Sequence, residues 1–122
     1  MRVLVACEYS GRVRNAFRDR GHDAWSCDLL PAEDGSTYHM QCDIRSVMDN
    51  YWHLVIAHPP CTYLTNSGER WLKGNPERAV LRQESVDFVR WIAGLPFAKI
   101  VVENPIGHLS TAWRKPDQII QP

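Results

Sequence analysis

Short apolar runs that alternate with helical patterns are the feature that most constrains the fold of this chain. The runs are rich in valine, leucine and isoleucine, and they predict strands at residues 2–7, 22–27, 38–42, 53–57 and 99–103. Val13, Ala16 and Phe17 share one helical face between the first two runs. Strands that alternate with helices predict a parallel sheet covered on both faces, which is an α/β fold.

The longest helix is predicted between the last two strands. Asn75-Pro76 has the residue types of an N-cap and a first helical position, and Gly94 with Pro96 ends the pattern. A short helical connector is expected at residues 45–50, and little pattern is visible from residue 109 onward. The apolar stripe of the long helix is predicted from Leu81, Ser85, Phe88, Val89 and Ile92. A solvated face is predicted for the arginines of the first helix, Arg12, Arg14, Arg18 and Arg20.

The composition narrows the class of protein. The chain has 122 residues, which suits one domain, and its 14 basic and 14 acidic residues argue against a strongly basic nucleic-acid coat. Its 4 cysteines form no CxxC pair and no zinc spacing, so free thiols and no metal site are expected. The apolar start at residues 1–5 is too short for a signal peptide or a membrane span, which predicts a cytoplasmic protein.

Chemically active residues follow two of the predicted strands. The run Leu54–Ala57 ends in His58-Pro59-Pro60-Cys61, and the two prolines stop strand pairing before the thiol. The last strand ends in Glu103-Asn104-Pro105. Sites in open α/β sheets gather at the carboxyl ends of strands, so a thiol and a carboxylate are expected there together. This pair suggests covalent chemistry with acid assistance.

These segments, in this order, resemble the S-adenosylmethionine-dependent DNA cytosine-5 methyltransferases, particularly compact phage-type members. The resemblance covers nearly the whole chain, as the first part of that catalytic domain, and implies a Rossmann-like sandwich with strand order 3-2-1-4-5. It implies a cytosine substrate in DNA, which leaves the helical stack to enter the site. It also implies that S-adenosylmethionine is held by Cys7, Glu8, Ser10, Gly11, Asp28, Leu29, Asp43, Ile44 and Pro59.

The resemblance assigns roles to particular residues. Asp28 would hold the cofactor ribose, Asp43 would meet the adenine amine, and Cys61 would attack cytosine C6. Glu103 would grip the N3 and amine edge of the base, and it is expected to be buried because it must keep or share a proton. Base contacts are implied for Pro60, Ser67, Asn104 and Pro105, with Ser67-Gly68 as the usual continuation of the nucleophile motif.

Only a thiolate adds readily to cytosine, so a nearby positive charge is expected to activate Cys61. Candidates are Arg70, Lys73, a helix N-terminus or a basic group of the substrate. The loop that carries these residues, at positions 62–73, is expected to close over the base and also contains Tyr63 and Trp71.

The chain also departs from the family pattern. It keeps only Gly11 in the cofactor loop, and it has Thr62 where many members have glutamine. The later arginine-containing motif, target-recognition region and closing cofactor motif are missing, so residues 1–122 are expected to form one catalytic domain or a fragment of it. A second copy or a partner chain is the expected source of the missing recognition region, in the cytoplasm of a bacterial or phage-infected cell.

Other interpretations of the same residues stay open. Cys61 alone is compatible with a buried structural thiol, Glu103 with a capping carboxylate, and Asp28 and Asp43 with turn formation. The chain would then be a non-catalytic module that binds a nucleotide or cofactor. An amino-directed DNA methyltransferase is a further alternative, but that class has Asp or Asn before Pro-Pro and an aromatic residue after it. Here those positions hold His58 and Cys61, which disfavours that class.

Overall fold

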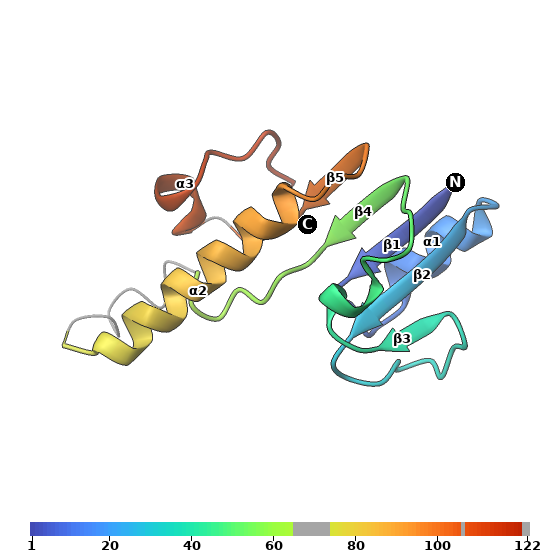
Figure 1. Cartoon of the computed structure of the whole chain (residues 1–122), viewed down its shortest axis with the longest axis horizontal. Helices are drawn as coiled ribbons and strands as arrows, with labels where there is room; N and C mark the ends of the chain where they lie inside the picture. The colour runs from blue at the N-terminus through green and yellow to red at the C-terminus, as the bar shows by residue number, and fades with distance from the viewer. Residues whose placement is uncertain (65–73, 106, 121–122) are drawn as a thin grey trace.

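The computed structural model describes residues 1–64, 74–105 and 107–120 and has one parallel sheet of 5 strands in the order β3-β2-β1-β4-β5 (Figure 1). This confirms the predicted α/β, Rossmann-like fold and its strand order. The elements are β1 (Arg2–Ala6), α1 (Arg12–Asp19), β2 (Asp23–Asp28), β3 (His39–Gln41), the 3-10 helix η1 (Ile44–Val47), β4 (Leu54–Ala57), α2 (Pro76–Ala93), β5 (Lys99–Val102) and α3 (Leu109–Ala112).

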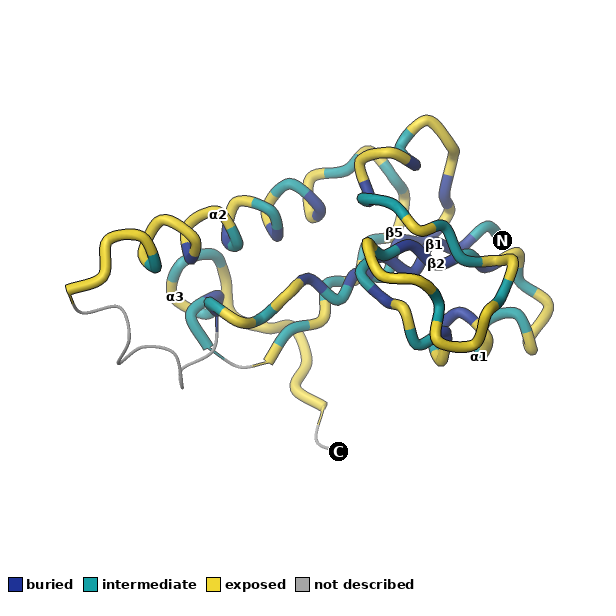
Figure 2. Tube along the Cα trace, turned by 90° about the horizontal axis from the view of Figure 1, so that it is seen from below, coloured by how far each residue is buried: buried dark blue, intermediate teal, exposed yellow. Residues whose placement is uncertain are grey.

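Helices lie on both faces of the sheet. Figure 2 shows α1 on one side of β1 and β2, and α2 on the opposite side. Neighbouring residues of β1 point to opposite faces, so the strand supplies both cores. Leu4 packs with Trp52 and Ile92 on the α2 side, whereas Val3 packs with Phe17 on the α1 side. The central strand is therefore fully buried, as a parallel strand between two helical layers must be.

Helix α2 begins and ends where the sequence predicts. The Asn75 side chain accepts a hydrogen bond from the Arg78 N–H at 3.1 Å, and Gly94 follows the last turn. The buried stripe differs from the prediction, because Val86 is buried whereas Leu81 is 39% exposed. The N-terminal half of α2 extends beyond the sheet (Figure 1), so no strand lies beneath Leu81. Among the described helices, none is long and apolar enough to cross a bilayer.

The tail after residue 109, which shows little pattern in the sequence, contains the one-turn helix α3. Leu109 is only 8% exposed and belongs to a cluster with Leu64, Val86 and Val89. The contacts that stabilise this turn come from α2 and from the segment after β4. A local sequence pattern therefore carries little signal for it.

The predicted solvated face of α1 is wrong at two arginines, Arg14 and Arg18. The Arg18 side chain is only 25% exposed, and its guanidinium donates to Ala24 O at 2.8 Å. Arg14 is fully buried, where its guanidinium donates to Ser26 Oγ at 2.7 Å and pairs with Asp34. A buried cation needs such partners, and the loop before β3 supplies the carboxylate. Arg12 and Arg20 are exposed, as expected. Arg14 thus ties α1 to β2 and to the following loop.

Gly11 is required by the same buried arginine. Gly11 has φ +80°, and a Cβ atom there would meet the Arg14 guanidinium and lie 2.7 Å from Asp34 Oδ2. Gly21 has φ +87° but open space around it, which makes Gly21→Ala a matched control. We expect Gly21→Ala to cost about 1 kcal/mol of unfolding free energy from backbone strain alone. Gly11→Ala should cost about 1–3 kcal/mol more in urea unfolding, because Arg14 cannot move aside. Equal costs would show that Arg14 is not fixed.

Candidate functional site

A cavity of about 440 Å³ lies at the carboxyl ends of β1, β2 and β3. The strand ends contribute Cys7, Asp28 and Asp43, and α2 contributes Ser85 and Phe88 on the opposite wall. This is the edge at which open parallel sheets bind ligands. The cavity is therefore the main candidate for a cofactor site among the described residues.

The predicted cofactor residues divide into two groups. Those that line the cavity are Cys7, Asp28, Leu29, Asp43 and Ile44. Those that do not line it are Glu8, Ser10, Gly11 and Pro59. Pro60, which the resemblance assigned to the base, lines the cavity together with Thr62 and Tyr63. The cavity is thus lined both by predicted cofactor residues at the strand ends and by Pro60, a predicted substrate residue in the segment after β4.

Glu8 occupies the N-terminus of α1. Cys7 has φ 59°, a left-handed turn that is rare for a non-glycine residue, and Glu8 follows it with 7% exposure. Glu8 Oε1 accepts hydrogen bonds from the Val13 N–H at 2.9 Å and from Ser10 Oγ at 3.0 Å. Glu8 Oε2 is buried and has no partner among the described residues.

The position of Glu8 has a consequence for ligand charge. Dinucleotide-binding folds place a pyrophosphate at the N-terminus of this helix, where free N–H groups attract anions. Here a buried carboxylate already accepts the Val13 N–H, so a phosphate would meet a negative charge. The arrangement favours a ligand that is neutral or positively charged at this point.

Asp28 and Asp43 both form turns at the edge of the cavity. Asp28 Oδ1 accepts the Leu30 N–H at 2.9 Å, and Asp43 Oδ1 accepts the Arg45 N–H at 2.8 Å. The turn-forming interpretation is therefore correct in geometry for both residues. Each carboxylate also lines the cavity, so the local turn does not remove it from a ligand.

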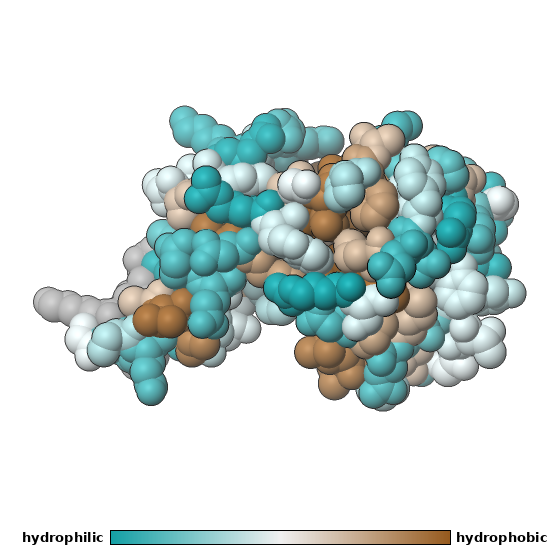
Figure 3. All heavy atoms as spheres, in the orientation of Figure 1, coloured by the Kyte–Doolittle hydropathy of each residue, from teal (hydrophilic) through white to brown (hydrophobic). Residues whose placement is uncertain are grey.

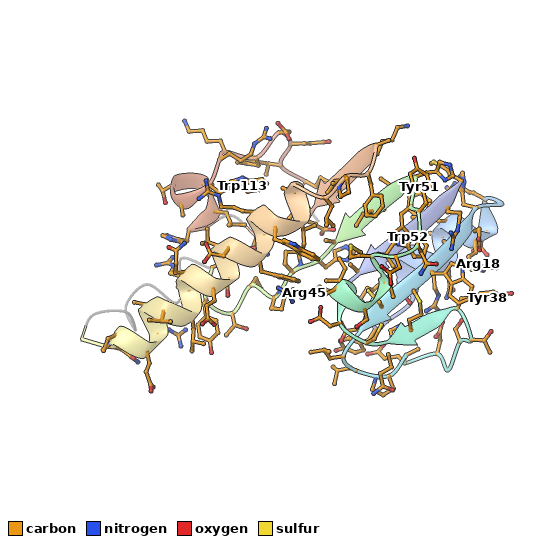
Figure 4. All side chains as sticks on the ribbon, viewed as in Figure 1. Arg18, Tyr38, Arg45, Tyr51, Trp52 and Trp113 are labelled. Carbon is orange, nitrogen blue, oxygen red and sulfur yellow. The ribbon has the colours of Figure 1, made fainter. Side chains whose placement is uncertain are left out.

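Arg45 links this edge of the sheet to α2. Its guanidinium lies 5.1 Å from the Phe88 ring centroid and 4.9 Å from the Trp91 ring, and it contacts both oxygens of Asp43 at 3.3 Å. Figure 4 shows Arg45 between η1 and α2. The sequence interpretation missed this residue, although its position two residues after Asp43 was a usable signal.

Three thiols lie on the sheet side of the cavity. Burial is the main cause that raises the pKa of Cys7 from 9.0 to about 11 and the pKa of Cys27 to about 12. Burial also raises the pKa of Cys42. These thiols are therefore protonated at neutral pH and form an uncharged lining beside the acidic residues.

The segments that carry Cys61 and Glu103 lie side by side. The Glu103 N–H donates to Ala57 O at 2.9 Å, and Asn104 Nδ2 donates to Pro59 O at 3.1 Å. Glu103 Oε2 lies 2.9 Å from His58 Nε2. We refer to these segments, residues 58–61 and 103–105, as the β4–β5 seam. Cys61 is half-buried there and forms no disulfide.

The expected burial of Glu103 is wrong. Its side chain is 68% exposed, and its carboxylate is paired with His58, which is 25% exposed. β5 is the edge strand of the described sheet, so no further strand shields the carboxylate. Pro105 is exposed as well. The pairing with His58 was not predicted, although the parallel order of β4 and β5 makes the residues that follow them neighbours.

Among the exposed large apolar side chains, Leu29 lines the cavity, whereas Leu30 and Val80 do not. Leu29 is 69% exposed and Leu30 is 52% exposed after β2, and Val80 is 57% exposed on α2. Figure 3 shows apolar surface at both places.

Several predicted residues of the loop that begins at Thr62 lie outside the described residues: Ser67, Gly68, Arg70, Trp71 and Lys73.

Comparison with family models, with curated proteins and with solved structures finds no match to this chain. Within the part of the chain that the structure describes, no group of three or more His, Cys, Asp or Glu side chains could hold a metal ion. The features that bear on function are therefore the motifs that carry the resemblance and the geometry of the cavity and of the β4–β5 seam.

Cys7 provides a test of the protonated lining. Since its pKa is raised from 9.0 to about 11, its thiolate fraction at pH 8 should fall roughly a hundredfold below that of an ordinary thiol. We expect iodoacetamide to label Cys7 at pH 8 at least about a hundredfold more slowly in the folded protein than in urea, measured by peptide mass spectrometry. Equal rates in both states would contradict the assignment.

Proposed function

We propose that this chain is a catalytic domain of a DNA cytosine-5 methyltransferase that uses S-adenosylmethionine. The observation that carries the proposal is the β4–β5 seam, because it holds a Pro-Pro-Cys segment beside a Glu-Asn-Pro segment through backbone, amide and ion-pair contacts. A nucleophilic thiol and a carboxylate at neighbouring strand ends are what addition to a pyrimidine ring requires. Pro60 extends from this seam to the cavity.

The charge of the cavity supports the choice of cofactor. S-adenosylmethionine has a sulfonium and an ammonium group and no phosphate, so a cavity with the carboxylates of Asp28 and Asp43 on its wall does not repel it. Asp28 would contact the ribose and Asp43 the adenine amine. The cavity volume of about 440 Å³ is in the usual range for small-molecule sites. Leu29, Ile44 and Phe88 offer apolar contacts to a nucleoside base.

The proposed reaction assigns one role to each residue of the seam. The Cys61 thiolate adds to C6 of a flipped cytosine, and Glu103 holds the N3 and amine edge. Bound S-adenosylmethionine supplies the methyl group for C5. Asn104 positions the seam through its hydrogen bond to Pro59 O. As part of the same proposal, the reaction takes place in the cytoplasm, and a second copy or a partner chain supplies target recognition.

A second candidate is a non-catalytic module that binds a nucleotide or cofactor. One observation favours it, because the Glu103 side chain is 68% exposed and therefore lacks the dry surroundings of a strong acid catalyst. The formal net charge of 0 supplies no general attraction to phosphate. The two candidates differ in whether Cys61 becomes covalently bound to cytosine.

The role of Asp43 in the cavity can be tested by measuring cofactor binding. Asp43→Asn keeps the cap on η1, since an amide oxygen can accept the Arg45 N–H, but it removes the charge. We expect it to weaken S-adenosylmethionine binding by roughly tenfold to a hundredfold in calorimetry. Asp49→Asn, at an exposed position outside the cavity, is the matched control and should bind like the wild type. Equal affinity of the two variants would remove Asp43 from the cofactor site.

A covalent trap tests the reaction itself. DNA that contains 5-fluorocytosine should form a stable adduct with the protein and S-adenosylmethionine, because fluorine at C5 blocks release of the base. We expect intact mass spectrometry to show this adduct with the wild type and at least about a hundredfold less with Cys61→Ser. Cys61→Ser should still bind S-adenosylmethionine, which controls for folding. Cofactor binding without any adduct from the wild type would favour the non-catalytic module.

A further inference from the structure

We infer that His58 is a positioning and proton-supplying residue for Glu103, so that the two side chains together hold the proton that the pyrimidine ring receives. This inference rests on the proposed function and adds a residue to it. Glu103 is not buried, so burial cannot keep a proton on it. A proton shared with His58 takes the place of burial and keeps an acid at this position.

The first support is how firmly His58 is held. The backbone N–H of His58 donates to Ala6 O at 3.0 Å, which fixes the backbone of His58 to the end of β1. Its Nε2 lies 2.9 Å from Glu103 Oε2, and the Glu103 N–H is fixed to Ala57 O. Both residues are thus anchored by their backbones at the ends of paired strands. An exposed carboxylate on its own would sample several rotamers, whereas this one has a fixed partner.

The second support is a pair of buried atoms without partners. His58 Nδ1 and Asn104 Oδ1 are both buried in the β4–β5 seam, and neither has a hydrogen-bond partner among the described residues. An amide oxygen can only accept a hydrogen bond, and Nδ1 donates when it carries a proton. Among the described residues, the imidazole ring of His58 is therefore paired with Glu103 alone, so a proton that leaves Nε2 passes to Glu103 and to no other described side chain.

The proton balance of the step is simple. Attack by the Cys61 thiolate forms the C6–S bond, and the π electrons of the ring move toward N3. The pair starts as a Glu103 carboxylate and a His58 imidazolium, which share one transferable proton. The Nε2–H bond of His58 breaks, and the Glu103 carboxylate takes this proton and passes it to N3, where the N–H bond forms. His58 is then neutral, and Glu103 is again a carboxylate. The pair loses one proton in total and regains it from N3 when the base is released.

Other titratable groups near His58 come from two neighbouring segments. Cys7 and Glu8 follow β1, to which the His58 N–H is bonded, and Cys61 lies in the same loop as His58. Cys7 is kept protonated by burial, and Glu8 accepts hydrogen bonds from Ser10 and Val13. Glu103 is therefore the group in the described structure whose charge is directly coupled to His58.

The test compares two substitutions of His58 across pH. His58→Gln keeps an N–H donor for Glu103 but carries no spare proton, and His58→Leu removes both functions. We expect adduct formation with 5-fluorocytosine DNA to be about tenfold slower than wild type in His58→Gln at pH 8 and nearly normal at pH 5.5. His58→Leu should be about a hundredfold slower at both pH values. His22→Gln, at the opposite end of the sheet, is the control and should behave like the wild type.

A second measurement needs no reaction. The imidazole N–H of His58, assigned through bond correlations within the residue in the wild type, is followed by NMR in the wild type and in Glu103→Gln. We expect its proton and nitrogen signals to change in Glu103→Gln and its exchange with water to become faster. An unchanged signal would overturn the pairing, even if the His58 variants fail to fold.

The outcomes separate the inference from the proposed function. An adduct that forms equally in His58→Gln and the wild type at every pH overturns the inference and leaves the function intact. So does a loss in His58→Gln that matches His58→Leu at both pH values, because that result indicates a structural role alone. A wild type that forms no adduct overturns the function, and the NMR comparison then still decides whether the two side chains share a proton.

Discussion

The parallel register of the central strand is the constraint on which the rest of the structure depends. Ala6 of β1 is paired with Cys27 of β2 on one side and with Ala57 of β4 on the other. Because all three strands end within about one residue of this level, the chain leaves the sheet at one edge. Cys7, Asp28 and His58 emerge there together, although they are far apart in the sequence. A slip by one residue would turn these side chains to the opposite face.

The prolines after β4 determine which contacts hold the β4–β5 seam together. Proline has no N–H, so the ladder between β4 and β5 cannot continue past Ala57 and the buried Pro59 carbonyl needs another donor. The Asn104 side chain is that donor, so a side-chain hydrogen bond joins the two segments where the backbone ladder has ended. The ion pair between His58 and Glu103 lies on the same seam. The Pro59 carbonyl thus explains the amide that follows β5, and the His58 side chain gives the carboxylate its partner.

The sequence predicted the sheet, its order and the residues at the strand ends, because these follow from apolar runs and a family resemblance. It failed where long-range contacts decide. Arg14 looks like any surface arginine until Asp34, from a loop 20 positions later, is placed beside it. Leu81 fits the helical stripe better than Val86, yet Val86 is the buried residue because Leu64 and Leu109, from distant parts of the sequence, pack in the same cluster. The exposure of Glu103 depends on β5 being an edge strand, which no local pattern encodes.

Burial also raises the pKa of three thiols of the chain, those of Cys7, Cys27 and Cys42, and this matters if the cavity holds S-adenosylmethionine. A methyl sulfonium is an electrophile, so a thiolate beside it would itself be methylated. Cys7 and Cys27 lie on the cavity wall with pKa values of about 11 and 12, so both are almost entirely protonated at neutral pH and are poor nucleophiles. The proposed nucleophile, Cys61, lies instead on the β4–β5 seam, between two residues that line the cavity. If S-adenosylmethionine binds in this cavity, burial would thus keep the thiols on its wall protonated beside the methyl sulfonium.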